Sequence, residues 1–168
     1  VSGTSISFGT AVVFESAVID YTGITYDANA QKVVIVYKDD GNSNYGTAIV
    51  GTVSGTSISF GTAVVFESAS TVYPSVTYDS NAQKVVVAYK DVGAGNIGTA
   101  IVGTVSGTSI SFGTAVVFAN NNVDYIKCAF DSSNNKVVIV YGDAANSDYG
   151  TAIVGTVSGT SISFGTEV

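Results

Sequence analysis

Few side chains in this sequence are suited to catalysis. It contains no His and no Arg, and Cys128 is its only thiol. The absence of His removes the usual Ser–His and Cys–His nucleophile systems and the usual zinc ligands. The absence of Arg removes the cluster that a sialidase-like site uses to hold its substrate carboxylate. We therefore predict a non-enzymatic protein with no catalytic residue, cofactor or metal; a glycosidase that uses Asp20 or Asp124 is the remaining enzymatic alternative.

Tyr, Asn and Asp side chains occur together in short segments whose composition suits carbohydrate binding. A tyrosine ring stacks on a sugar ring, and Asn or Asp hydrogen-bonds its hydroxyl groups. The alternative interpretation is that the tyrosines pack between repeats and that Asn and Asp stabilise turns. The predicted ligand-binding residues are Asp20, Tyr21, Asn42, Asn44, Tyr45, Tyr73, Asn96, Asp124, Tyr125, Asn146, Asp148 and Tyr149.

Two further acidic patterns were tested for chemistry. The loop from Asp40 to Gly46 has oxygen ligands at the spacing of a calcium loop, but its Gly stands one place late and the distal Glu is missing. We therefore predict no calcium site. Asp27, Asp79 and Asp131 each precede a polar turn, where we expect them to cap the turn.

These candidate residues lie between the copies of one repeated block. The block GTAIVGTVSGTSISFGTAVVF spans Gly46–Phe66, returns unchanged at 98–118 and begins again at Gly150, with a period of 52 residues throughout. A fixed period of this length indicates a repeat architecture. The chain is therefore predicted to be one repeat domain, residues 1–168, with repeats at 1–52, 53–104 and 105–156 and a partial repeat at 157–168.

Each repeat is predicted to form four strands. The chain is rich in Val, Ile, Thr and Tyr and has no Leu or Met, which favours an all-β fold. In the second repeat the strands are predicted at Pro74–Asp79, Lys84–Lys90, Thr99–Val105 and Ser109–Phe118, the last with a bend at Gly113 and Thr114. The second strand reads VVIVY or VVVAY without polar alternation, so we expect both faces of its sheet to be buried.

About fifty residues, four antiparallel strands and two buried faces are typical of one blade of a β-propeller. Three blades do not close a ring of ordinary size, so we predict a homodimer that forms a ring of six blades. The alternatives close with threefold symmetry inside one chain: a β-prism, or a β-trefoil, whose usual Gln-x-Trp motif this Trp-free chain cannot carry. Copies of the fourth strand at both termini, Val1–Phe14 and Ser161–Val168, would compete for one place.

Two segments of each repeat differ between the copies. One is the approach to the first strand, and the other is the loop between the second and third strands. In an up-and-down blade both leave the same end of the strands, so we predict that they share one face of the ring. Variable loops on a rigid scaffold commonly bind ligands, and neutral drift is the alternative. The segments are 18–23, 70–75 and 122–127, and 40–45, 92–97 and 144–149.

Charge and hydropathy exclude several partners. The net charge is −7 with only six Lys, which argues against binding to nucleic acid or to an anionic membrane surface. No apolar run is long enough to cross a membrane, so no membrane insertion is predicted. Cys128 has no second Cys to pair with, and we expect a small buried side chain there.

Three segments of the repeat resemble the near-identical propeller-type repeats of marine bacteriophage and bacterial proteins. They are VSGTSISFGTAVVFES, followed by SVTYDSNAQKVVVAYKD and GTAIVGT. The resemblance covers all three repeats and implies a virion or extracellular surface setting. It carries no catalytic motif. We predict a lectin-like module whose partners are itself and glycans; the alternative is a structural assembly element, such as part of a phage fibre, with no ligand of its own.

Overall fold

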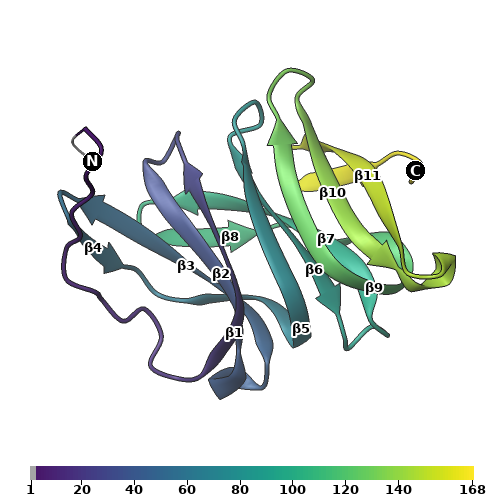
Figure 1. Cartoon of the computed structure of the whole chain (residues 1–168), viewed down its shortest axis with the longest axis horizontal. Coiled ribbons are helices and arrows are strands. Elements are labelled where there is room, and N and C mark those ends of the chain that lie inside the picture. Colours follow the sequence, from purple (N-terminus) through teal and green to yellow (C-terminus); the bar gives the residue numbers. More distant parts are fainter. Residues whose placement is uncertain (1–2) are drawn as a thin grey trace.

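The chain folds into one open antiparallel sheet of twelve strands in this computed structural model, which describes residues 3–168 (Figure 1). The prediction of an all-β chain is confirmed. Single-turn 3-10 helices, η1 (Asp40–Asn42) and η2 (Ala144–Asn146), follow the second and tenth strands. The strands are β1 (Ile19–Asp27), β2 (Lys32–Asp39), β3 (Tyr45–Ser54), β4 (Ser57–Phe60), β5 (Val64–Asp79), β6 (Lys84–Asp91), β7 (Ile97–Ser106), β8 (Ser109–Phe112), β9 (Val116–Asp131), β10 (Lys136–Asp143), β11 (Tyr149–Ser158) and β12 (Ser161–Phe164).

The same strand pairing occurs three times along the sheet. Val33 pairs with Gly51, Val85 with Gly103 and Val137 with Gly155, each in the middle of an antiparallel hairpin. We call β1–β4 the first unit, residues 71–112 the second unit and residues 123–164 the third unit. The units follow one another from the N-terminal to the C-terminal side of the molecule, with the two chain ends on opposite sides (Figure 1).

The hydrophobic core lies between successive units. Val36 of β2 clusters with Val87 of β6, and Ala88, on the other face of β6, clusters with Ile139 of β10. All four side chains are fully buried. Since the second strands of the first two units bury both faces, the prediction made from their uninterrupted apolar runs is confirmed for β2 and β6.

In the third unit the same apolar run is buried on one face only. β2 and β10 share the sequence VVIVY, but Val140 of β10 is 44% exposed, whereas the equivalent Val36 is fully buried. Val154 of β11 is 42% exposed, whereas the equivalent Val50 is fully buried. The difference arises because no fourth unit in the described chain covers this side of the third.

The fourth strand of each unit is not the single strand that we predicted over Ser109–Phe118. It is split into β8 and the beginning of β9, with Gly113 between them. The Gly113 N–H donates to the Val102 carbonyl at 2.9 Å, and the Cα of Gly113 lies against the backbone carbonyl of Thr160. A side chain has no room there, so glycine lets the chain cross to the other half of β7.

The approaches to the first strands, predicted as connections, are also strand. β5 and β9 are 16 residues long: their first halves pair with the third strand of the preceding unit and their second halves with the second strand of their own unit. The partner changes between Ser70 and Thr71 in β5 and between Asn122 and Val123 in β9. An irregularity in the register follows, where Tyr73 and Tyr125 have φ of 56° and 57°. A residue in the left-handed backbone conformation changes the direction of the strand without ending it.

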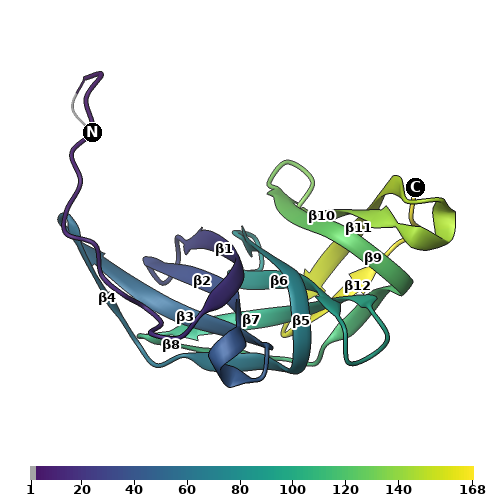
Figure 2. The same cartoon turned by 60° about the horizontal axis from the view of Figure 1, so that its bottom comes forward.

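The two terminal copies of the fourth strand have different places. The C-terminal copy forms β12, which pairs with β11, and Val168 exchanges backbone hydrogen bonds with Ala152. Residues 3–14 of the N-terminal copy lie along the first unit, where Gly9 contacts the Thr56 carbonyl as Gly61 contacts that of Thr108. Figure 2 shows this segment extending along the outside of β4 toward the N-terminus.

Candidate binding face

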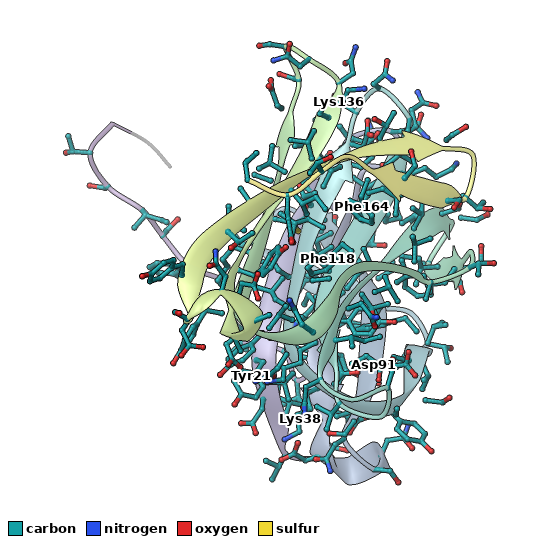
Figure 3. All side chains as sticks on the ribbon, turned by 90° about the vertical axis from the view of Figure 1, so that its right-hand side faces the viewer. Tyr21, Lys38, Asp91, Phe118, Lys136 and Phe164 are labelled. Atoms are coloured by element: carbon teal, nitrogen blue, oxygen red, sulfur yellow. The ribbon has the colours of Figure 1, made fainter. Side chains whose placement is uncertain are left out.

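Backbone hydrogen bonds join the two variable segments at one end of the molecule. The Asp40 N–H donates to the Val18 carbonyl at 3.1 Å, and the Thr71 N–H donates to the Asn44 carbonyl at 3.0 Å. We call this surface the variable end. Figure 3 shows Tyr21 and Lys38 at this end and Lys136, at the start of β10, at the opposite end.

Three tyrosines form a row across the units at the variable end. The ring centroids of Tyr21 and Tyr73 are 5.0 Å apart in an edge-to-face arrangement, and those of Tyr73 and Tyr125 are 5.5 Å apart. Each tyrosine has positive φ, between 51° and 57°. Tyr125, at the end of the row, is 74% exposed and Tyr21 is 44% exposed. The expectation of packing between repeats is therefore met, while two ring surfaces remain accessible for stacking.

Asp20 and Asp124 are both bound to lysines that the sequence analysis did not single out. Lys38 Nζ lies 3.2 Å from Asp20 and 2.9 Å from Asp40, and it also lies 6.0 Å from the centroid of the Tyr21 ring. Lys90 Nζ lies 2.8 Å from Asp124 of the next unit. Both carboxylates are thus paired with a lysine at the variable end.

The Asn and Asp residues of the loops between second and third strands have backbone roles. Asn44, Asn96 and Asp148 have φ of 63°, 69° and 60°, the left-handed conformation that Asn and Asp tolerate. The Asn42 N–H donates to the Asp39 carboxylate at 3.1 Å. Asn146 lies in η2.

Of the tyrosines that follow these loops, Tyr149 is 64% exposed and Tyr45 is half-buried. The structure thus brings the predicted residues to one end of the molecule, while their binding to a ligand stays a prediction.

The recurring aspartates cap turns, as expected. Asp79 is buried, and its carboxylate accepts hydrogen bonds from the Asn81 and Ala82 backbone at 2.9 and 2.8 Å. Asp27 makes the same pair of bonds, and hydrogen bonding from Asn134 and Ser133 holds the pKa of Asp131 below its usual value. Within residues 3–168 no group of three His, Cys, Asp or Glu side chains is placed to hold a metal ion.

Hydrogen bonds from buried tyrosines to glutamates were not foreseen. The Tyr89 hydroxyl donates to Glu67 at 3.0 Å, and the Tyr141 hydroxyl donates to Glu167 at 2.7 Å. In the third repeat Ala119 stands where the second has Glu67, and Glu167, in the segment after β12, supplies the acceptor instead. Burial first, and then the glutamate charge, raises the pKa of Tyr89 well above its usual range.

Cavities lie at the two outer faces of the molecule, and one of them reaches Tyr125 at the end of the row of tyrosines. One of about 460 Å³ opens on the outer face of the third unit between Tyr125, Val140 and Gly150. Another of about 280 Å³ lies beside it between Asn121 and Asp143. On the first unit a cavity of about 200 Å³ is lined by Phe14, Ile24 and Ile35.

Comparison with known proteins places the chain in no family. No family model matches it, and neither the curated proteins nor the solved structures contain a significant match. Among the described residues, no helix is long and apolar enough to span a membrane.

Proposed function

We propose that this chain is a non-enzymatic, self-assembling scaffold in which each four-stranded unit is a β-propeller blade. Two copies associate head to tail, so that the outer face of the third unit of each copy covers the first unit of the other. The result is a closed ring of six blades, within the usual range for propellers. A head-to-tail contact that closes on itself gives a finite ring rather than a filament.

The observation that carries this proposal is the different burial of equivalent strands. In the first two units Val36 and Ala88 are fully buried against the next unit, whereas the equivalent Val140 is 44% exposed. The repeats have apolar residues at these equivalent positions, so the outer face of the third unit has the same apolar character as the faces that are packed inside the chain. An apolar face of this kind is typical of an interaction surface.

The outer face of the first unit offers the complementary half of the contact. Ile24 is 64% exposed and Tyr26 is 55% exposed, whereas the equivalent Val76 is buried and Tyr78 is half-buried between the first two units. These positions are related by the same 52-residue period. The two outer faces are therefore the two halves of an interface that the chain makes twice within itself.

The mass of the protein in solution tests the proposal. We expect light scattering to give about twice the 17.0 kDa of one chain. The substitution Val154→Lys places a charge in the contact and should give single chains. Val117→Lys is the matched control, because Val117 is 45% exposed on β9 away from both outer faces. A wild-type protein that stays a single chain at all concentrations would contradict the proposal.

Glycan recognition at the variable end is a second candidate function, favoured by the row of Tyr21, Tyr73 and Tyr125. Rings on neighbouring units would bind sugars weakly one at a time, and several sites on one rigid ring would act together. A glycan array probed with the assembled protein tests it. Tyr125→Ala should remove binding while the mass of the assembled protein stays unchanged, and Phe8→Ala, which changes an aromatic side chain 83% exposed elsewhere, should retain it. An array without any bound glycan would exclude this function.

A further inference from the structure

One edge of β11 lacks a strand neighbour that the equivalent strands possess. Ala48 of β3 pairs with Val64, and Ala100 of β7 pairs with Val116; Val168 makes the corresponding pair with Ala152 of β11. In the first two units, β5 or β9 then continues along the edge of the third strand toward the loop between the second and third strands. On β11, the edge from Tyr149 to Thr151 has no such partner within residues 3–168.

The added strand follows the same register in both complete examples. Thr47 pairs with Val65 and Gly46 with Glu67, while Thr99 pairs with Val117 and Gly98 with Ala119. The residues of β11 that correspond to these positions are Thr151 and Gly150.

Gly150 marks the place of an absent aromatic ring. At Gly46 and Gly98, the Cα lies directly against the ring of Phe66 or Phe118, and both glycines are buried. Gly150 is exposed, and a Cβ built on it has nothing within 4 Å. The cavity of about 460 Å³ opens at this point. The third unit thus has a slot of the shape that a phenylalanine fills in the other two.

A matching segment lies at the other side of the molecule. Val13–Val18 is equivalent to the strand residues 65–70, and it contains Phe14. Phe14 already packs on the first unit, with its ring centroid 5.4 Å from Tyr37 and 5.8 Å from Phe60. These separations match those of Phe66 to Tyr89 and Phe112, which are 5.2 and 5.7 Å.

Val13–Val18 is positioned like a strand that adds to the edge of a neighbouring unit, but within residues 3–168 no such edge pairs with it. The Val18 carbonyl accepts from the Asp40 N–H, as the Ser70 carbonyl accepts from Val92. Residues 13–18 nevertheless form no strand, and Val13 is 76% exposed and Val18 70% exposed. In the second unit the equivalent segment owes its strand to β3 of the preceding unit.

We propose that Val13–Val18 of a second copy of this chain adds as a strand to the free edge of β11 and seats its Phe14 ring over Gly150. The inference rests on the proposed self-assembly and names the segment that joins the copies. Strand addition supplies the backbone hydrogen bonds that fix the register, and the Phe14 slot supplies specificity. By equivalence, Thr151 pairs with Val13 and Gly150 pairs with Glu15 of the second copy.

Cross-linking between two differently labelled chains tests this pairing. One chain carries Val13→Cys and the other carries Thr151→Cys, both with Cys128→Ala to remove the native thiol. After mixing, a short bifunctional thiol reagent should link the two chains into a covalent dimer. The matched control is one chain with Thr47→Cys and Val65→Cys, because this pair has the same register inside the molecule and should be linked within the chain with a similar yield.

The outcomes separate the inference from the proposed function. A dimeric mass with a cross-linking yield near that of the internal control supports both. A dimeric mass without the Val13–Thr151 link overturns the inference and leaves the assembly. A single-chain mass overturns both.

A second variant tests the Phe14 slot. Gly150→Phe fills the space with the chain's own ring and should reduce the intermolecular link at least tenfold. Its circular dichroism spectrum should be unchanged, because the space around Gly150 is open. An undiminished yield in a folded Gly150→Phe protein would show that Phe14 does not occupy this slot.

Discussion

Single side chains hold the turns between the first and second strands, and the aspartates at these turns could be assigned from the sequence. Asp79 follows an apolar strand and precedes Ser80 and Asn81, a pattern typical of a side chain that accepts hydrogen bonds from the turn backbone. The structure confirms the two bonds to Asn81 and Ala82. Their burial makes the position sensitive to substitution.

We predict that Asp79→Ala lowers the free energy of unfolding by about 1–3 kcal/mol, since it removes two hydrogen bonds worth about 0.5–1.5 kcal/mol each. Asp131→Ala should cost clearly less, because Asp131 is more exposed and its turn is solvated. Denaturant unfolding of both variants measures the difference. Equal losses would mean that burial does not govern the strength of the cap.

The buried tyrosines, in contrast, could not be assigned from the sequence. Whether Tyr141 finds a carboxylate depends on how the chain after β12 folds back, and the nearest repeat equivalent of Glu67 is Ala119. Only the packed structure shows that Glu167 takes this role. All three tyrosines at this position, Tyr37, Tyr89 and Tyr141, have a pKa raised above the usual range by burial and a neighbouring glutamate.

A raised phenol pKa predicts the direction of the pH dependence. The folded state favours protonated Tyr89, so its contribution to stability is complete below the unfolded-state pKa of about 10 and is lost as pH rises above it. Absorbance at 295 nm during alkaline titration should show that Tyr89 ionises only with unfolding. The difference between wild type and Tyr89→Phe isolates this signal. A Tyr89 component that titrates near pH 10 in folded protein would contradict the assignment.

At the scale of elements, the second strands were the easiest to predict and the fourth strands the hardest. The run Val85–Tyr89 is apolar at every position, which is sufficient to infer two buried faces. The stretch Ser109–Phe118 also reads as one strand, but its two halves pair with different halves of β7. The break is set by the contact of Gly113 with Thr160 of the following unit, a tertiary effect that local propensity does not contain.

This contact predicts unequal effects for two equivalent glycines. Gly113→Val should lower the free energy of unfolding by about 1–3 kcal/mol, the range for overpacking, because its Cβ would collide with the Thr160 backbone. At Gly165 the nearest atom to an added Cβ is the Val154 carbonyl oxygen at 3.8 Å, so Gly165→Val should be nearly neutral. Thermal unfolding of dilute protein compares the two. Similar losses would show that the crossing is limited by something other than the following unit.

At the scale of the whole molecule, the period of 52 residues predicted equivalent units but not their unequal environments. The run VVIVY, which β2 and β10 share, is buried differently in the two strands because burial depends on the neighbouring unit. The middle unit is packed on both faces and each outer unit has one face without such a neighbour. In repeat architectures, stability is approximately the sum of the units and of the contacts between neighbours.

Hydrogen exchange should therefore be graded along the chain. In protein diluted to single chains, amides of β6 should exchange more slowly than those of β10, whose outer face is open. On concentration, protection of β10 should rise to that of β6. Exchange measured by mass spectrometry at two protein concentrations provides the test. Uniform protection at both concentrations would mean that the units do not unfold separately.

The position of Gly9 against Thr56 has a consequence for the rate at which copies join. Residues 3–11 lie where the corresponding residues of a second copy's β12 region would have to lie, and the two segments have nearly the same sequence. Association must first displace one segment by the other, nearly identical one, much as in strand exchange. Encounter would then be followed by a slow unimolecular step, and the ring would form over minutes rather than at the diffusion limit. Removing residues 1–10 should accelerate that step without changing the final mass of the ring.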